Sequence, residues 1–181
     1  GNHYQWGRPA DGHEITVWNG ATPTSGRGFH AATGLEALAT SDAPGHPNFI
    51  LTNVSPYDWR GNNNNNRWAT ANQGPCPAGY HVPTITEWAT AVAFDGGAAT
   101  NGGTTVGWDN NTETYNSALK LPSAGLRNRV NGLLNYQGTD GFYWSSTVSV
   151  SDARYLFFYS TAVNTNFINR AFGFSVRCLR D

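Results

Sequence analysis

Charge and methionine are both scarce in this chain of 181 residues. Charged side chains make up 13% of it and the net charge is −1 at neutral pH, whereas about 25% is the usual charged share. We therefore expect neither a basic surface for nucleic acid nor a strongly acidic one for cationic partners. Because methionine is absent and the chain begins at Gly1, we expect the natural start to precede it. The lack of a signal peptide at this end then says nothing about secretion.

Long apolar runs are missing as well. No run of about 18 apolar residues occurs, so no membrane-spanning segment is expected. In place of charge the chain has 21 glycines, 9 prolines and many asparagines, while 7 Trp, 8 Tyr and 9 Phe supply bulk for a core. This composition is typical of a loop-rich domain, and the length suits a single domain over residues 1–181.

Only two cysteines are present, Cys76 and Cys178, about a hundred residues apart. Two alternatives fit them: a pair of buried free thiols, or a disulfide that ties the end of the chain to its middle. A metal site on these cysteines is not expected, because neither has a second ligand at zinc-finger spacing.

Catalytic motifs are also lacking. The five histidines form no i,i+4 pair, and Ser145 and Ser146 lie outside any Gly-x-Ser-x-Gly turn. Residues 108–113 (WDNNTE) carry oxygen ligands without the calcium-loop pattern, so a polar loop is expected there. We predict no catalytic residue, no metal and no cofactor.

The secondary structure expected is α+β with high loop content. Thr84 and Glu87 form a capping box for an amphipathic helix over residues 84–94. Alternation and turn residues predict strands at 13–20 and 48–53 and a closing strand at 172–181. Two less regular segments are expected to be a short helix at 34–41 and a solvated loop through the five asparagines at 62–66.

The segment 154–160 (RYLFFYS) is apolar on both faces of an expected strand. Either both faces are buried, or one face presents aromatic side chains to a ligand. The surrounding residues 148–172 combine aromatic residues with Ser, Asn and Thr on a background of low charge. That mixture is typical of recognition surfaces, because aromatic rings supply contact area and small polar groups adapt to the partner.

Six segments in order along the chain resemble the Fibrobacter succinogenes major paralogous domain family: YQWGR (4–8), YDWR (57–60), CPAGYHVPTITEW (76–88), LKLPSAGLRN (119–128), GFYWSS (141–146) and GFSVRCLRD (173–181). The resemblance implies a C-type-lectin fold, with short twisted antiparallel strands and one or two helices. It also supports pairing of Cys76 with Cys178. The Glu-Pro-Asn and Trp-Asn-Asp calcium motifs of lectins are absent, so calcium-dependent sugar binding is not implied.

The region 148–172 is similar to the variable region of proteins diversified by retroelements, which share the C-type-lectin fold. Those retroelements mutate template adenines, so an Asn codon can become any codon ending in C or T, which excludes Met, Trp, Gln, Lys and Glu. None of these five types occurs in 148–172. The resemblance implies ligand-contacting, variable residues at Ser149, Val150, Ser151, Asp152, Tyr155, Phe157, Tyr159, Asn164, Asn166, Phe167, Ile168, Asn169 and Phe172.

This resemblance predicts that Tyr155, Phe157 and Tyr159 face outward and that Leu156 and Phe158 face the core. We also expect Trp88, Trp144 and Val176 to be buried. The function implied is a ligand-binding domain, outside a cell or on the surface of a cell or virion, whose partner is a protein or cell-surface molecule. Two alternatives are a surface or structural domain that is not diversified, and an enzyme of the formylglycine-generating type. That chemistry would need reactive cysteines or copper.

Overall fold

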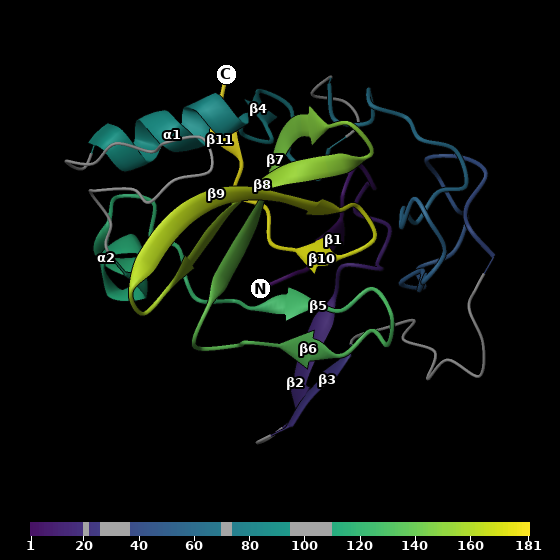
Figure 1. Ribbon diagram of the computed structural model, residues 1–181, viewed down its shortest axis with the longest axis horizontal. Coiled ribbons are helices and arrows are strands. Elements are labelled where there is room, and N and C mark those ends of the chain that lie inside the picture. The colour runs from purple at the N-terminus through teal and green to yellow at the C-terminus, as the bar shows by residue number, and fades with distance from the viewer. Residues whose placement is uncertain (20–21, 26–36, 70–73, 95–109) are drawn as a thin grey trace.

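The computed structural model describes residues 1–19, 22–25, 37–69, 74–94 and 110–181. Within these ranges the chain forms two helices and a set of mostly short strands arranged in several antiparallel sheets, which confirms the α+β class (Figure 1). In chain order the elements are β1 (Tyr4–Gln5), β2 (Thr16–Asn19), β3 (Thr22–Ser25), β4 (Tyr80–His81), α1 (Ile85–Phe94), α2 (Asn111–Asn116), β5 (Leu126–Arg127), β6 (Leu134–Asn135), β7 (Gly141–Ser149), β8 (Asp152–Tyr159), β9 (Ala162–Asn169), β10 (Gly173–Phe174) and β11 (Leu179–Arg180).

The longest strands form the antiparallel sheet β7-β8-β9, with β8 in the centre. The segment 154–160 therefore lies almost entirely in this central strand. Because paired residues share a face, the register places Trp144, Tyr155 and Asn166 on one face of the sheet, which we call face A. Tyr143, Leu156 and Thr165 lie on the opposite face, face B. Strand β9 was not among the strands predicted from the sequence.

Helix α1 covers face B, where it lies along the three-stranded sheet in Figure 1. Trp88 and Val92 of the helix pack with Leu156, Phe158 and other apolar residues of this face. The ring of Phe158 stacks on Tyr143 with 5.8 Å between ring centroids. Burial of Trp88, Leu156 and Phe158 confirms their predicted place in the core.

The start of α1 follows the predicted capping box. The carboxylate of Glu87 accepts hydrogen bonds from the backbone N–H of Thr84 (2.7 Å) and from its hydroxyl (2.8 Å), and the Thr84 hydroxyl accepts one from the Glu87 N–H (3.2 Å). The backbone N–H of Ile85, which has no partner within the helix, donates to the Thr147 hydroxyl. Thr147 lies where the register between β7 and β8 shifts, between Trp144 and Val148. The helix start is thus fixed to the sheet as well as capped.

Face A packs in a second cluster of buried apolar side chains, separate from the cluster between face B and α1. This second cluster includes residues of the four-stranded sheet β1-β10-β5-β6. Trp144 stacks on Phe174 of β10 at 4.2 Å, and Tyr155 meets the same ring edge-on at 4.9 Å. Strand β8 is consequently buried on both faces where Tyr155 and Leu156 lie. Trp144 is buried as predicted, whereas Val176 is only half-buried, which corrects its predicted burial.

The two cysteines form a disulfide, with 5.7 Å between the Cα atoms of Cys76 and Cys178. Beside it, β11 pairs with β4, so the end of the chain is joined both covalently and by a short antiparallel ladder to the segment before α1. Closing a loop of this length is worth about 4–5 kcal/mol in the chain-entropy model. The structure therefore confirms the predicted disulfide and rules out the alternative of two free thiols.

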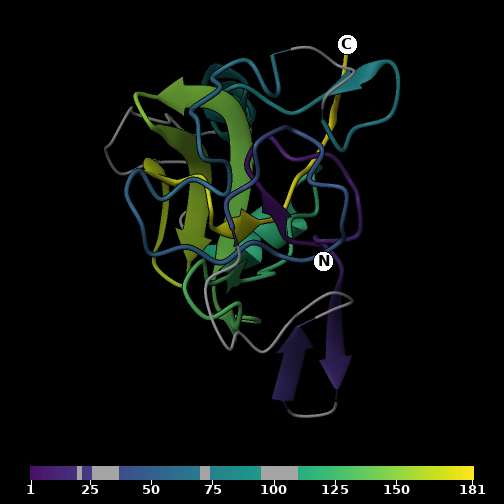
Figure 2. The same cartoon turned by 90° about the vertical axis from the view of Figure 1, so that its right-hand side faces the viewer.

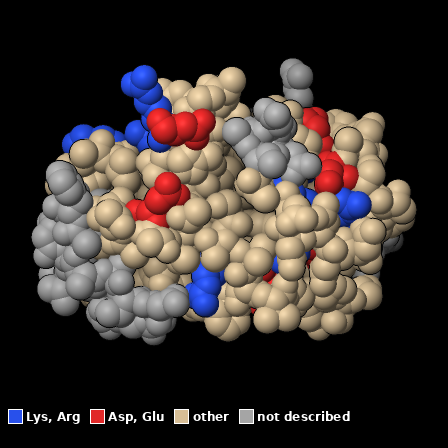
Figure 3. Space-filling model, turned by 90° about the horizontal axis from the view of Figure 1, so that it is seen from above, with Lys and Arg blue, Asp and Glu red and all other residues tan. Residues whose placement is uncertain are grey.

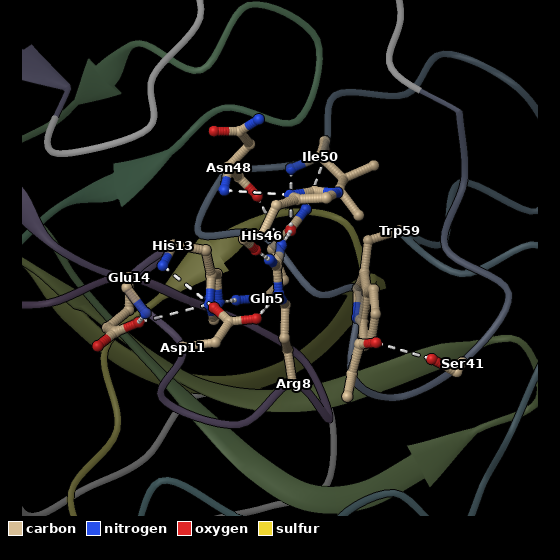
Figure 4. A network of polar contacts seen from close by, with 12 residues as sticks. Gln5, Arg8, Asp11, His13, Glu14, Ser41, His46, Asn48, Ile50 and Trp59 are labelled. Atoms are coloured by element: carbon tan, nitrogen blue, oxygen red, sulfur yellow. Dashed lines mark hydrogen bonds and ion pairs between the residues drawn. The ribbon is translucent and has the colours of Figure 1, made fainter.

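A buried polar network explains why residues 48–53 form no strand, although they are mostly buried as predicted. The Gln5 side chain donates to the carbonyls of Ile50 (2.8 Å) and Ala171 (3.0 Å) and accepts from the Ile50 N–H (3.2 Å) (Figure 4). The guanidinium of Arg8 donates to the carbonyls of Asn48 and His46. Side chains therefore make the hydrogen bonds to backbone N–H and C=O groups that a neighbouring β-strand would otherwise make.

The five-asparagine segment is also more structured than expected. The side-chain amide of Asn64 donates to Asp42, the backbone carbonyl of Asn64 accepts from the Arg67 guanidinium, and the Asn65 side chain accepts from Arg170 at 2.6 Å. Arg67 and Arg170 are fully buried, and Arg67 forms an ion pair with the buried Asp58. Four of the five asparagines are exposed, as expected for a solvated loop, but the hydrogen bonds of Asn64 and Asn65 fix this part of it to the rest of the domain.

Three further predictions need correction. Of the polar loop expected at 108–113, residues 108 and 109 lie outside the described part, and the remainder contains the start of α2, where the Asn110 side chain caps the helix by accepting from the N–H groups of Thr112 and Glu113. The closing strand predicted at 172–181 is divided into β10 and β11. Of the helix predicted at 34–41, residues 34–36 lie outside the described part, and the remainder is not helical.

The strand predicted at 13–20 is confirmed for residues 16–19, which form β2; residues 13–15 lie before the strand and residue 20 lies outside the described part. The β2–β3 hairpin projects from the rest of the chain in Figure 2. Within the described ranges, neither helix is long and apolar enough to cross a membrane.

Candidate functional site: an aromatic surface beside the central sheet

The thirteen candidate residues fall into four groups in the structure. Six lie on face A, in β8 and β9: Tyr155, Phe157, Tyr159, Asn164, Asn166 and Ile168. Three lie where the chain turns from β7 into β8: Ser149, Val150 and Ser151. Asp152, Phe167 and Asn169 lie on face B towards the same end of the sheet, and Phe172 follows β9. The structure thus gathers about half of the candidates on one face and distributes the others around the hairpin end.

Burial separates these candidates from their neighbours. Twelve of the thirteen are half-buried or exposed, with Phe167 at 53% and Val150 at 89% exposure. The buried residues that alternate with them are Ala153, Leu156, Phe158, Ala162, Val163, Thr165, Arg170 and Ala171. Side chains inside and at the surface therefore alternate closely along this segment.

Tyr155 is the exception, and its predicted outward orientation is wrong. Only 7% of it is exposed, because Phe174 of the four-stranded sheet and Trp144 cover its ring. Burial raises the pKa of its phenol to about 12. The prediction treated face A as open to solvent along its whole length, whereas the four-stranded sheet covers the Tyr155 end.

Farther along β8, face A comes to the surface. Phe157 and Tyr159 are half-buried and stack on each other at 5.2 Å. Phe157 also packs on Phe142 at 4.9 Å, and Phe142 contacts Tyr136, which is 58% exposed, at 6.1 Å. Asn164 of β9 lies directly opposite Phe157. We call Tyr136, Phe157, Tyr159 and Asn164 the aromatic surface.

Tyr57 and Phe172 form a second group of half-buried rings. Phe172 is connected to the aromatic surface through Phe174 and Phe142, with 6.1 Å between the ring centroids of Phe172 and Phe174 and 5.1 Å between those of Phe174 and Phe142. The guanidinium of Arg129 lies 4.3 Å from the ring centre of Tyr57 and 5.7 Å from that of Phe172. The Arg129 head group also donates to the Thr52 carbonyl at 2.7 Å. Aromatic and cationic groups are thus held in place before any ligand arrives, which lowers the entropy cost of binding.

Sequence analysis missed Tyr136, Tyr57 and Arg129, because they lie far from residues 148–172 in the sequence. Tyr136 and Tyr57 share one signal: each has a positive φ, of 63° and 61°. Residues other than glycine adopt this conformation uncommonly, and it marks sharp turns that can display a side chain. The sequence contains no turn motif strong enough to predict it at either position.

Val150 at the hairpin turn is held in an unfavourable backbone conformation. Its φ is 56°, and its carbonyl accepts a hydrogen bond from the buried Arg170 guanidinium at 3.2 Å. A β-branched residue with positive φ is an outlier, whereas asparagine and glycine adopt this conformation readily. The side chain is almost fully exposed, so packing does not compensate for the strain.

We expect Val150→Asn to raise the free energy of unfolding by about 1 kcal/mol, because it relieves this strain and leaves the carbonyl in place. Val130→Asn is the matched control, since Val130 is exposed but has no positive φ. Urea denaturation measures both variants. Equal effects of the two substitutions would contradict the explanation based on backbone strain.

One cluster of potential metal ligands lies elsewhere, at Asp11, His13 and Glu14. The His13 ring accepts from the backbone N–H of Gln5 at Nε2 (3.0 Å), so the neutral ring carries its proton on Nδ1 and donates it to Asp11 at 2.7 Å. Both ring nitrogens are therefore engaged, and Asp11 also accepts from Arg8 (Figure 4). Burial lowers the pKa of His13 to about 4, partly offset by the hydrogen bond to Asp11. These contacts fit a structural network better than a metal site.

The cysteines offer no free thiol, because both belong to the disulfide. The alternative of an enzyme of the formylglycine-generating type required reactive cysteines or a copper site. Only a reduced form of the protein would supply the thiols.

Comparisons of the chain with protein-family models, with curated proteins and with solved structures find no match.

Proposed function

We propose that this chain is a ligand-binding domain of the C-type-lectin type, in which residues 148–172 present a surface diversified by a retroelement. The observation that carries the proposal is the separation by burial along this segment. Twelve of the residues assigned as variable are accessible, and many of the residues between them are buried. Such a segment can change its contacts with a ligand while its buried side chains keep the fold.

The strained turn at Val150 supports the same proposal. A position selected for folding alone would favour asparagine or glycine, because these residues adopt a positive φ at lower cost. Asparagine is also the residue that an unmutated template codon would specify there. Valine at this position is consistent with a side chain that arose by diversification rather than by selection for stability.

The ligand we propose is a protein or another cell-surface molecule recognised mainly through aromatic and amide contacts. The aromatic surface combines half-exposed rings with Asn164 and contains no charged residue. In Figure 3, charged groups form only small patches among uncharged residues on the face in view. We therefore expect binding that depends weakly on salt. The disulfide suits an oxidising location, outside a cell or on the surface of a cell or virion.

A pair of libraries tests whether the segment tolerates diversification. The first randomises eight accessible positions to codons ending in C or T: Ser149, Val150, Phe157, Tyr159, Asn164, Asn166, Phe167 and Ile168. The second applies the same codons to the eight buried neighbours: Ala153, Leu156, Phe158, Ala162, Val163, Thr165, Arg170 and Ala171. We expect most members of the first library to resist protease on the display host and few members of the second, because buried changes usually cost several kcal/mol.

Selection of the first library against egg-white lysozyme should then yield binders whose affinity disappears when the selected residues revert. Equal protease sensitivity of the two libraries, or failure to obtain binders, would argue against the proposed surface. A domain that is not diversified could still pass the protease test. The DNA beside the gene separates these alternatives, because diversification requires a reverse transcriptase and a near-copy of this segment with adenines at the variable codons.

A further inference from the structure

A pocket of about 290 Å³ opens beside β1, and none of its lining residues belongs to the segment 148–172. Its walls include Tyr4, Tyr143 and Ser175, and Lys120 and Arg177 also line it. A water molecule occupies about 30 Å³ in the liquid, so the space suits a molecule of roughly a dozen non-hydrogen atoms. The pocket shares no residue with the aromatic surface, so a ligand bound here would lie outside that surface.

The pocket has a buried interior and a charged rim. Leu121, Tyr143 and Ser175 are buried, whereas Lys120 and Arg177 are exposed. No acidic residue lines it. Arg177 makes no hydrogen bond or ion pair with another residue in the described ranges, and it lies near enough to Tyr143 to oppose the rise in that phenol's pKa that burial causes. The charge at the rim is therefore available to an anion.

The backbone of Lys120 supports a function at this rim. Its φ is 51°, an uncommon conformation for a residue with a side chain. The Lys120 ammonium donates to the Asn116 carbonyl at 3.2 Å, which uses one of its three N–H donors. Two donors remain for a ligand.

The hydroxyl groups of the pocket define the rest of the ligand. Tyr143 donates its proton to the Pro122 carbonyl at 2.8 Å, and Ser175 donates to the Asn2 carbonyl at 3.3 Å. With their protons engaged, both hydroxyl oxygens offer only lone pairs to the pocket. They would accept hydrogen bonds from ligand hydroxyls, while the cationic rim would bind a carboxylate.

We propose that this pocket binds a small hydroxylated carboxylate. The cations hold the carboxylate at the rim by charge-assisted hydrogen bonds. The hydroxyls of the ligand reach inward to Tyr143 and Ser175, and Tyr4 covers one side. An uncharged polyol of the same size lacks the first of these contacts, and an inorganic anion lacks the second.

Isothermal titration with D-gluconate tests the site, with D-sorbitol as the uncharged probe of matched length and sulfate as the inorganic anion. We expect saturable binding of gluconate that weakens as salt is added, and much weaker binding of sorbitol and sulfate. Arg177→Gln should weaken gluconate binding about tenfold, which corresponds to 1.4 kcal/mol. Arg180→Gln is the matched control, because Arg180 is exposed, lies three residues farther on and does not line the pocket.

Several outcomes would overturn the proposal. If gluconate does not bind, or binds no better than sorbitol, the carboxylate does not contribute to binding as proposed. If sulfate binds as tightly as gluconate, the hydroxyl groups of the ligand do not contribute to binding as proposed. Equal losses in the Arg177 and Arg180 variants show that general charge attraction, rather than the pocket, accounts for binding. Thermal melts of both variants should match the parent protein, because both side chains are exposed.

Discussion

Replacing Phe158 by alanine is expected to lower the free energy of unfolding by about 3–5 kcal/mol. Phe158 is fully buried between face B and helix α1, where its ring stacks on Tyr143. The neighbouring strand is adapted to this ring, since a Cβ added to Gly141 would lie 2.0 Å from the Phe158 Cζ. Truncation therefore leaves a cavity that small side-chain movements cannot fill.

Phe157→Ala is the matched control for this substitution, because Phe157 is the preceding residue but lies on the other face and is half-buried. We expect a smaller loss, of about 1–2 kcal/mol, mainly from its contact with Phe142. Urea denaturation of both variants gives the comparison. Equal losses would show that Phe157 belongs to the core and would weaken the proposed aromatic surface.

A double-mutant cycle tests the fit of Phe158 against Gly141 directly. Gly141→Ala should be strongly destabilising in the parent protein, where the new methyl group would overlap the ring. In the Phe158→Ala background the same change should cost far less, because the ring is gone. Additive effects of the two substitutions would contradict the close contact.

Acid is expected to destabilise the protein between pH 6.5 and about 4, before most carboxylates titrate. Burial lowers the pKa of both His3 and His13 from 6.5 to about 4. Between these values the unfolded chain binds protons that the folded chain does not, so stability is present above pH 6.5 and lost as the pH falls. Two shifts of this size correspond to about 3 kcal/mol each, at 1.36 kcal/mol per pKa unit.

Denaturation in urea at a series of pH values measures this loss. His13→Gln should flatten the curve between pH 6.5 and 4, because one of the two groups that take up protons on unfolding is removed. His81→Gln should not flatten it, since hydrogen bonds to Asp181 and Glu87 raise the pKa of His81, which stabilises the protein towards acid. A parent protein whose stability is constant over this pH range would contradict the buried, neutral state of both histidines.

Local patterns in the sequence predicted those parts of the fold that depend on neighbouring residues. The capping box of Thr84 and Glu87 needs only contacts within four residues, and the structure has it as expected. Residues 48–53 were predicted to be buried, but not how they are held there, because Gln5 supplies their hydrogen bonds from a distant part of the chain. Alternation within one segment carries no information about such a partner.

The candidate site shows the same limit. The pattern in 154–159 left open which face of the strand is buried, and the family resemblance correctly predicted that Leu156 and Phe158 face the core. It could not predict that Phe174, from another sheet, covers Tyr155 while leaving Tyr159 half-exposed. Nor could it connect Tyr136 and Tyr57 to the surface, since their contribution depends on how the sheets pack. Which part of an apolar face stays open is decided by tertiary contacts.

The disulfide also determines what a single cut by a protease can do. The whole of β7, β8 and β9 lies within the covalent loop closed by Cys76 and Cys178. A peptide bond broken anywhere between the two cysteines would leave both fragments in one molecule. The accessible segment 148–172 could therefore be nicked without release of the strands that follow it, and only a reductant would separate the pieces.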